Sequence, residues 1–232
     1  MSTALRVVVF GSTGTAGSEA VRQCLADPRI VEVRAVTRRA TGAQHTKLRE
    51  IICDDFDALP GMEDTFTGID ACFFCLGISQ SQAQSEDHYR QITVVYPLSA
   101  ARALRERSPE HTFHYLSGQG ADPSGKSLFM WARVKGEAEN TLRDMDLRRL
   151  FIHRPGYIHP ERAFARPGVG AAMGRALFPV MRAIAPGSAI RAVELGRAMI
   201  EATLSDSPGG LLENRDIRAF AERAPAATAE ER

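Results

Sequence analysis

The chain of 232 residues has no excess of charge of either sign. Lysine and arginine number 29, against 28 for aspartate and glutamate, so the molecule as a whole has no field that would attract nucleic acid or an anionic membrane. The basic residues are scattered and the aromatic residues show no stacking pattern, which also argues against a nucleic-acid partner. Any anion must therefore be bound by a local group of donors.

Long hydrophobic runs are absent as well. No apolar stretch of the sequence approaches the roughly 20 residues that cross a bilayer. A strand-like run begins at Leu5, which leaves no room for a secretory signal before it. We therefore expect a cytoplasmic protein without a membrane span. The length suits one large domain with at most a small appended lobe.

Cysteine is scarce, with four residues in the whole chain. Cys72 and Cys75 have the spacing of a redox or zinc pair, but they lie in an apolar run that indicates a strand. Three strand steps separate their Cα atoms by roughly 10 Å, which exceeds the roughly 7 Å limit for a disulfide. His111 and His114 would point to opposite faces of a strand. We expect buried, unreactive thiols and no metal site.

Apolar, β-branched runs alternate with segments of helical periodicity along the first two thirds of the chain. The runs predicted to be strands are 5–10, 31–37, 50–53, 71–76, 112–117 and 150–154. Helical periodicity is clearest at 17–26, 88–107 and 128–145. This alternation predicts an α/β fold, a doubly wound parallel sheet of the Rossmann type with helices on both faces.

The regular alternation stops after Arg154. We expect residues 1–154 to form a nucleotide-binding core and residues 155–192, rich in proline and glycine, to form a small substrate or lid region. The apolar stretch 170–185 within it is expected to pack over the substrate cleft. Residues 193–218 are predicted to form a C-terminal helix and a segment that returns to the core. Residues 219–232 are predicted to be a flexible tail.

A glycine-rich loop follows the first predicted strand and opens a helix, the context that makes such a loop a candidate phosphate cradle. The first glycine permits a tight turn, the second lets a pyrophosphate approach the backbone, and the third lets the helix pack on the sheet. The helix N-terminus then offers free N–H groups and the positive end of its dipole. The predicted contacts are Gly11, Ser12, Thr13, Gly14, Thr15, Ala16 and Gly17.

The end of the second strand indicates which dinucleotide is bound. An acidic residue there would bind the ribose 2′-hydroxyl, but the sequence has Arg38 and Arg39 instead. Guanidinium groups bind a phosphate through paired, charge-assisted hydrogen bonds. We therefore predict NADP(H) rather than NAD(H), with the alternative, stronger for Arg39, that the two arginines are only solvated.

Two further short segments are weaker candidates for cofactor contacts. Asp55 and Phe56 follow the third strand and could lie beside the adenine, with the carboxylate accepting from its amino group. Leu76 and Gly77 end the fourth strand, where a small residue lets the backbone pass the ribose.

Together these motifs resemble the extended or atypical short-chain dehydrogenases/reductases, and more narrowly the TIP30 group, the HTATIP2-like oxidoreductases. The resemblance implies an NADP(H)-binding Rossmann domain with a small C-terminal substrate region, and it puts Lys135 and Pro155 among the cofactor contacts. The partner is then a small-molecule substrate or a protein, and a homodimer stays open. Besides the four segments above, the matching residues are Cys75 and the segments 116–122, 134–137, 154–156 and 211–214.

In the wider family, a serine after the fifth strand, a tyrosine and a lysine four residues later form the catalytic set. The resemblance places Ser117 and Lys135 in two of these positions, and the tyrosine position is occupied by Trp131. An indole N–H is a donor with no usable acidity. Because general acid or base assistance is worth roughly 100-fold to 10,000-fold, Trp131 predicts weak turnover by the usual route.

Another group could supply the proton. Tyr157 follows the sixth strand and is the first candidate, although the favoured alternative is a core aromatic residue with a satisfied hydroxyl. Lys135 is the second, because burial lowers the pKa of a lysine. Three functions stay open: an NADP(H)-dependent oxidoreductase of a small carbonyl compound, a non-catalytic NADP(H) sensor acting through a protein partner, and, less favoured, a nucleotide-sugar epimerase.

Overall fold

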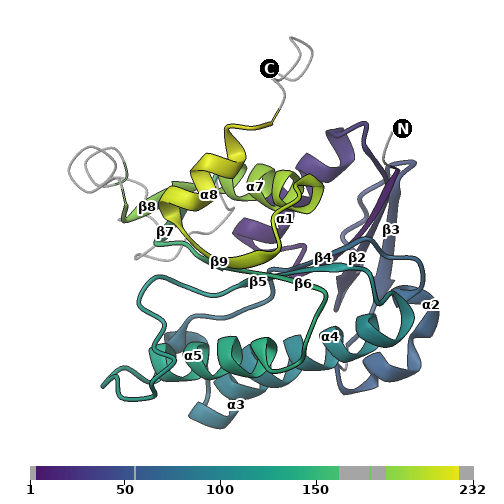
Figure 1. Cartoon of the computed structure of the whole chain (residues 1–232). Coiled ribbons are helices and arrows are strands. Elements are labelled where there is room, and N and C mark those ends of the chain that lie inside the picture. Colours follow the sequence, from purple (N-terminus) through teal and green to yellow (C-terminus); the bar gives the residue numbers. More distant parts are fainter. Residues whose placement is uncertain (1–3, 55, 162–177, 179–186, 225–232) are drawn as a thin grey trace.

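The structure, a computed structural model, describes residues 4–54, 56–161, 178 and 187–224 (Figure 1). A parallel sheet of seven strands runs through it in the order β3-β2-β1-β4-β5-β6-β9. Its strands are β1 (Leu5–Phe10), β2 (Ile30–Thr37), β3 (Leu48–Ile52), β4 (Ala71–Phe74), β5 (Thr112–Leu116), β6 (Arg149–Arg154) and β9 (Gly209–Glu213). Two short strands, β7 (Tyr157–His159) and β8 (Ala189–Arg191), form a separate parallel pair. The predicted doubly wound sheet is confirmed.

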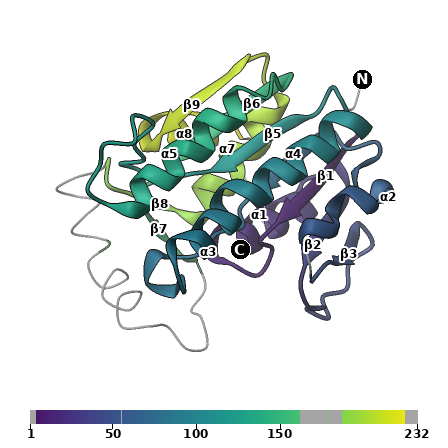
Figure 2. The same ribbon diagram turned by 90° about the horizontal axis from the view of Figure 1, so that it is seen from below.

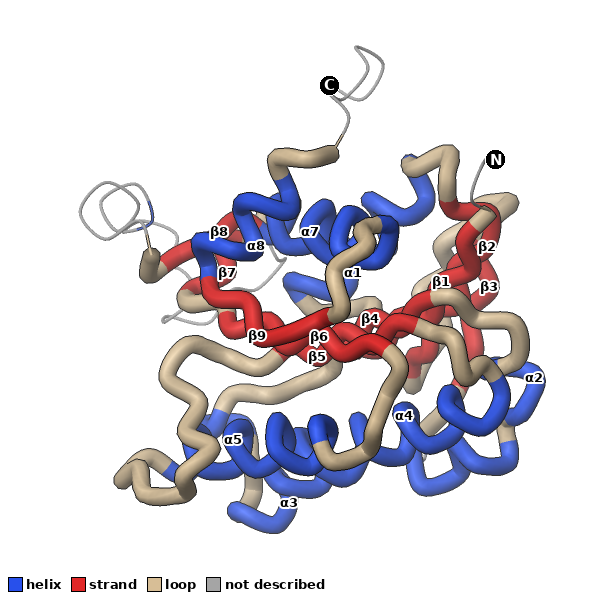
Figure 3. The backbone as a smooth tube through the Cα atoms, in the orientation of Figure 1, coloured by secondary structure: helices blue, strands red, loops and turns tan. Residues whose placement is uncertain are grey.

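Helices cover both faces of the sheet in three layers (Figures 1 and 3). One face carries α1 (Thr15–Ala26), α7 (Ala192–Leu204) and α8 (Asn214–Ala221). The other carries α3 (Glu86–Arg90), α4 (Tyr96–Arg107) and α5 (Met130–Arg143), with α4 and α5 side by side (Figure 2). Shorter pieces are α2 (Glu63–Phe66), the 3-10 turns η1 (Phe56–Gly61) and η2 (Gln80–Gln82), and the π turn η3 (Gln91–Val95).

The two faces have cores of different composition. Along β1, Val8 and Phe10 face the α3–α5 layer, where aromatic rings pack around Phe10. Val7 and Val9 face the other layer, which is built mainly from aliphatic side chains. There α1 and α7 approach closely at Gly196, since a Cβ atom at that position would lie 3.4 Å from the Ala20 Cα. Burial on both faces explains why the central strands are continuous apolar runs.

The predicted helix 88–107 is interrupted by the π turn η3, and the cause is Pro97. Proline has no N–H and its ring clashes with the carbonyl four residues earlier, which here belongs to Thr93. The Tyr115 hydroxyl donates to that carbonyl oxygen at 3.0 Å and so occupies the free acceptor. The helix continues past the turn as α4. The predicted position of the helix is therefore correct, but the helix is not regular along its whole length.

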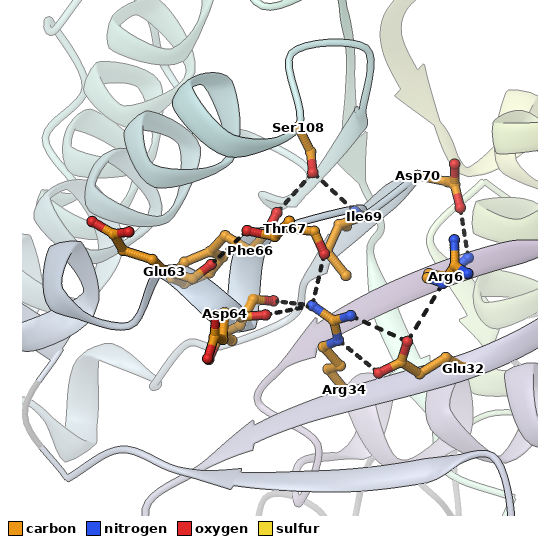
Figure 4. Close-up of polar contacts among 11 residues, drawn as sticks. Arg6, Glu32, Arg34, Glu63, Asp64, Phe66, Thr67, Ile69, Asp70 and Ser108 are labelled. Carbon is orange, nitrogen blue, oxygen red and sulfur yellow. Dashed lines mark hydrogen bonds and ion pairs between the residues drawn. The ribbon is translucent and has the colours of Figure 1, made fainter.

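The amino-terminal ends of the strands carry a polar network with a structural role (Figure 4). The Arg34 guanidinium donates to the carbonyl oxygens of Asp64 at 2.7 Å, Thr65 at 3.0 Å and Thr67 at 2.9 Å, and it pairs with Glu32 at 2.8 Å. These are carbonyls that the short helix α2 leaves without intrahelical donors. The network therefore closes α2 and fixes it to β2.

The C-terminal part of the chain completes the sheet. Strand β9 pairs with β6, and α8 continues to Ala221 with Phe220 packed in the core. Residues 219–221, which the sequence assigns to a tail, therefore belong to a helix. The expected stretch 170–185 lies outside the described residues, apart from Phe178. In the described part of the chain, no helix is long and apolar enough to cross a membrane.

All four cysteines are buried and free, which confirms the expectation of buried thiols. Burial raises the pKa of Cys75 to about 12 and that of Cys72 well above its ordinary value. Both thiols are therefore protonated and unreactive at neutral pH. Within the described ranges, no group of three or more potential metal ligands of the His, Cys, Asp or Glu type occurs.

Candidate cofactor and catalytic site

The loop between β1 and α1 needs two of its three glycines for internal packing. Gly11 has φ +76°, and a Cβ atom there would lie 2.7 Å from the Leu76 main-chain nitrogen. A Cβ atom at Gly17 would lie 2.2 Å from the Gly11 carbonyl oxygen. The first glycine therefore lets β1 turn beside the end of β4, and the third lets α1 start against the loop.

The remaining glycine of the loop, Gly14, is not required by packing within the protein. Gly14 has φ −84°, and the nearest atom to an added Cβ would be the Gly11 carbonyl oxygen at an ordinary 3.5 Å. Gly77, at the end of β4, has no atom within 4 Å of an added Cβ. Both positions leave the main chain open at the carboxyl edge of the sheet, as close approach of a ligand requires.

Donors converge on this open surface. Helix α1 begins with no side-chain cap and no acidic residue in its first turn. Its first intrahelical bond is from the Ser18 N–H to the Gly14 carbonyl, so the N–H groups of Thr15, Ala16 and Gly17 have no helical acceptor. The Ser12 hydroxyl is buried and has no hydrogen-bond partner among the described residues. These groups fit a phosphate at a helix N-terminus.

The end of β2 presents the two arginines to solvent. Arg38 and Arg39 are exposed, and no ion pair of either is found among the described residues. The Thr37 hydroxyl donates to the Arg39 carbonyl at 3.0 Å, which turns the chain as the strand ends. The guanidinium groups are thus available to an anion, and their role as 2′-phosphate contacts stays a prediction.

The other predicted cofactor contacts have mixed positions. Asp55 lies outside the described residues. The Phe56 ring is 4% exposed and packs between Phe10, 6.1 Å away, and Tyr96, 4.8 Å away. Any contact of position 56 with an adenine would therefore come from its main chain. Leu76 is half-buried and packs against the same core.

Lys135, on α5, lies against the end of β5. Its Nζ donates to the Ser117 carbonyl oxygen at 2.9 Å and to that of Leu116 at 3.4 Å. Burial lowers the pKa of Lys135 to about 8, while the nearby Glu139 carboxylate acts in the opposite direction. An amine of this kind is partly deprotonated near neutral pH and can give or take a proton.

The Ser117 side chain is held by a residue that the sequence analysis missed. Its hydroxyl donates to Glu139 Oε1 at 2.6 Å, and Glu139 is fully buried. The same carboxylate accepts from Arg154 Nε at 2.8 Å and Nη2 at 2.5 Å, and from Arg143 at 3.3 Å. The signal in the sequence was the spacing, because Glu139 follows Lys135 by one helical turn.

The Ser117 hydroxyl proton is therefore committed to a carboxylate in this arrangement. A hydroxyl has one proton to donate, so orienting a carbonyl oxygen would require Ser117 to give up its bond to Glu139. Ser117 is 5% exposed. Its predicted catalytic role stays a prediction, and its observed bonds join α5 to the end of β5.

Trp131 lies one turn before Lys135 on α5 and is half-buried. Its indole ring lies over the loop after β5, since a Cβ atom at Gly120 would lie 3.3 Å from Trp131 Cη2. The side chain thus forms a wall next to Lys135, with an N–H that can donate but cannot be a general acid.

Tyr157 begins β7, directly after the end of β6. Its main-chain N–H donates to the Ser188 carbonyl at 2.8 Å, and its ring is half-buried beside Phe178, 6.4 Å between centroids. Pro155 is buried, and its carbonyl accepts from the Gln119 N–H at 2.8 Å. The segment that carries Tyr157 is therefore joined to the loop after β5.

The candidate residues share one edge of the sheet. The glycine loop follows β1, Arg38 follows β2, Ser117 follows β5 and Pro155 follows β6. The carboxyl ends of parallel strands form the crevice in which doubly wound proteins bind nucleotides. This edge combines an anion cradle with a partly deprotonated amine, which suits a dinucleotide and proton transfer.

The chain is similar to known proteins over most of its length. The model of the NAD dependent epimerase/dehydratase family matches residues 7–128. The chain is 30% identical to "Protein HTATIP2" of Rattus norvegicus over 218 residues, which cover 91% of this chain and 87% of the relative. It is 28% identical over 205 residues to "Protein fmp52, mitochondrial" of Emericella nidulans, covering 85% of this chain and 87% of the relative.

Solved structures are similar in fold. A short chain dehydrogenase from Burkholderia cenocepacia J2315, determined in complex with NADP, superimposes with a TM-score of 0.69 at 13% identity. The alignment covers 96% of this chain and 95% of that one. At this identity the likeness concerns the fold.

Proposed function

Since the chain belongs to the NAD dependent epimerase/dehydratase family, we propose that it is an NADP(H)-dependent oxidoreductase of a small carbonyl compound, with Lys135 as the proton donor. The observation that carries the proposal is the Lys135 amine, held on two main-chain carbonyls at the end of β5 with a pKa of about 8. This group lies one helical turn from Trp131, where the family's tyrosine would stand, so it is the acid closest in sequence to the lost one.

The glycine loop, the free N–H groups of α1 and the Ser12 hydroxyl would hold the pyrophosphate, and Arg38 would hold the 2′-phosphate. NADPH held in this way would supply the hydride for reduction of the carbonyl carbon. The Lys135 ammonium gives its proton to the carbonyl oxygen, which becomes a hydroxyl, and the neutral amine is reprotonated from water. Trp131 lines the cleft and excludes water from the reacting atoms.

The proton donor is tested with two variants, assayed at saturating NADPH on a panel of small aldehydes and ketones. Lys135→Met should lower kcat by roughly 100-fold or more, the usual size of general acid assistance. In the parent protein, kcat should fall as pH rises through about 8, because only the ammonium form donates. A large loss in Tyr157→Phe, with turnover retained in Lys135→Met, would instead assign the proton to Tyr157.

The cofactor is tested by fluorescence titration. We expect tighter binding of NADPH than of NADH, and the charge reversal Arg38→Glu should narrow or invert that preference because a carboxylate repels a 2′-phosphate. NADH affinity in the same variant is the internal control. Equal affinities of the parent protein for the two dinucleotides would remove Arg38 from the site.

A non-catalytic NADP(H) sensor acting through a protein partner is the second candidate, and Trp131 is the observation that favours it. The variant Trp131→Tyr distinguishes the two functions. If the cleft accepts a carbonyl beside the nicotinamide, the restored phenol should raise turnover. NADPH binding without turnover in both the parent and this variant would support the sensor.

A further inference from the structure

A buried ion pair, formed by Glu139 and Arg154, lies behind the candidate site. Neither residue has a direct part in the proposed reaction. Glu139 is fully buried, and the Arg154 side chain that binds it with two bonds is 14% exposed. Placing two charges in the interior costs desolvation energy that their attraction often fails to recover. An apolar pair would hold α5 on β6 equally well, so the charges call for another explanation.

The contacts of Glu139 supply one. Its carboxylate accepts from the Ser117 hydroxyl, and the Ser117 carbonyl in turn accepts from Lys135 Nζ. Glu139 also lies one helical turn after Lys135, so the two side chains share a face of α5. One carboxylate is thereby bonded to the end of β5, to the end of β6 and to the helix that carries the amine.

We propose that Glu139 is a positioning residue for Lys135: with Arg154 it fixes the Ser117 backbone that holds the amine, and it places a carboxylate on the same face of α5 as that amine. The reaction served by this arrangement rests on the function proposed above. Arg154 pairs with the buried Glu139 carboxylate and orients it by a two-bond contact.

The surroundings of Lys135 agree with this role. Among the described residues, the charged group that acts on Lys135 is Glu139 of α5. The charged and titratable groups that act on Glu139 in turn include Arg143 of α5, Arg154 of β6 and Tyr115 of β5. Burial raises the pKa of Tyr115 well above its ordinary value, so this phenol is neutral. The two arginines bind the Glu139 carboxylate itself. Burial lowers the pKa of Lys135 and the Glu139 carboxylate opposes part of that effect, so removing the carboxylate should lower the fraction of ammonium near neutral pH.

The test is a titration of Lys135 that needs neither substrate nor cofactor. The chain has three lysines, Lys47, Lys126 and Lys135, so trace acylation with acetic anhydride across pH 6 to 11 can follow each amine by peptide mass. In the parent protein Lys135 should titrate near pH 8. In Glu139→Gln its midpoint should move down by on the order of one unit, the size expected when a neighbouring charge is removed.

Three comparisons separate charge from packing. Glu137→Gln removes the same charge from the same helix, at a residue that pairs with Arg90, and it should leave the Lys135 midpoint unchanged. Glu139→Asp keeps the charge on a shorter side chain, so it should retain the midpoint even where the melting temperature falls. If Glu139→Gln fails to fold because Arg154 is stranded, Glu139→Gln with Arg154→Met removes both charges and should still show the downward shift.

A folded Glu139→Gln protein, or the folded double variant, whose Lys135 titrates as in the parent would overturn the proposal. A shift as large in Glu137→Gln would do the same, because the effect would then be a general one of the helix. The outcome is independent of the proposed function. A protein with the expected shift and no turnover on any carbonyl keeps the positioning role and loses the reductase.

Discussion

Gly14 and Gly17 belong to the same loop but are glycines for different reasons. A Cβ atom at position 17 would overlap the Gly11 carbonyl oxygen at 2.2 Å, whereas one at position 14 meets an ordinary contact at 3.5 Å. Forced overpacking in an ordered region costs about 1–3 kcal/mol and sometimes more. We predict that Gly17→Ala lowers the free energy of unfolding by at least that amount, measured by urea denaturation at pH 7.5.

Gly14→Ala is the matched variant, and it should behave in the opposite way. Its stability should stay within about 0.5 kcal/mol of the parent, as for substitutions that create no clash. Its affinity for NADPH should fall, because the methyl group would stand where the pyrophosphate approaches the backbone. Unchanged NADPH affinity in folded Gly14→Ala would mean that the phosphates lie elsewhere.

At the residue scale, the sequence predicted positions better than partners. The positions of the glycine loop and Lys135 at the carboxyl edge of the sheet could be predicted because they depend on spacing along the chain, and their roles stay predictions. The bond between Ser117 and Glu139 could not, since it joins residues from a strand end and a helix that come together only when α5 packs on the sheet. Arg154 belongs to the motif at 154–156, but no pattern in the sequence connects it with its partner Glu139.

At the scale of elements, Asn214 joins Gly156 to Gly187, two positions that are far apart in the sequence. Its Oδ1 accepts from the Gly156 N–H at 3.2 Å, and its Nδ2 donates to the Gly187 carbonyl at 2.6 Å. The side chain is 2% exposed. Helix α8 therefore fixes the start of β7, where Tyr157 lies, through one amide group.

This pair of hydrogen bonds, called here the Asn214 clamp, can be tested by a variant that removes only one of the two bonds. Asn214→Asp keeps an acceptor for Gly156 but loses the donor to Gly187 and places a carboxylate next to a carbonyl, which should cost about 1–3 kcal/mol. Amide hydrogen exchange at Tyr157, whose N–H donates to the Ser188 carbonyl beside Gly187, should become faster. Asn140→Asp, which removes an exposed bond to the Pro123 carbonyl, is the control and should change neither quantity. Equal effects of the two variants would contradict the clamp.

The strands could be predicted from the sequence where burial on both faces determines the residue pattern. Strands buried on both faces are mainly apolar runs. Strands β1 and β4 follow that rule closely, and β2, β5 and β6 follow it apart from the buried Arg34, His114 and His153. Strand β9 could not be predicted from the sequence, because it begins with Gly209 and Gly210, both with positive φ. A Cβ atom at Gly209 would lie 2.5 Å from the Leu150 carbonyl oxygen. Its place is decided by the edge of β6, which no local pattern encodes.

At the scale of the whole molecule, two buried histidines join the sheet to the α7 layer. His114 Nδ1 lies 3.0 Å from His153 Nε2, and His114 Nε2 lies 3.0 Å from the Thr203 hydroxyl. That hydroxyl donates to the Met199 carbonyl, so it accepts from His114. His114 then accepts from His153 through Nδ1, and both rings are neutral. The chain of bonds runs from β6 through β5 to α7.

This arrangement makes the fold sensitive to mild acid. Burial lowers the pKa of His153 from 6.5 to about 3 and that of His114 well below 6.5, and the pKa of His111 is lowered in the same way. In mild acid these histidines therefore bind more protons in the unfolded chain than in the folded chain. Stability is full above pH 6.5 and is lost as pH falls below it, by up to about 1.4 kcal/mol per pH unit for each histidine.

We therefore predict that the urea midpoint is nearly constant from pH 7.5 to about pH 6.5 and falls between about pH 6.5 and pH 5, above the range in which the paired carboxylates titrate. His153→Gln removes one of the protons taken up on unfolding, so its midpoint should depend less steeply on pH even though its stability at pH 7.5 is lower. His45→Gln, at an exposed position, should keep the slope of the parent. A parent midpoint that is flat over this interval would show that the buried pair takes up protons in the folded state, and the neutral chain of bonds from β6 to α7 would then be wrong.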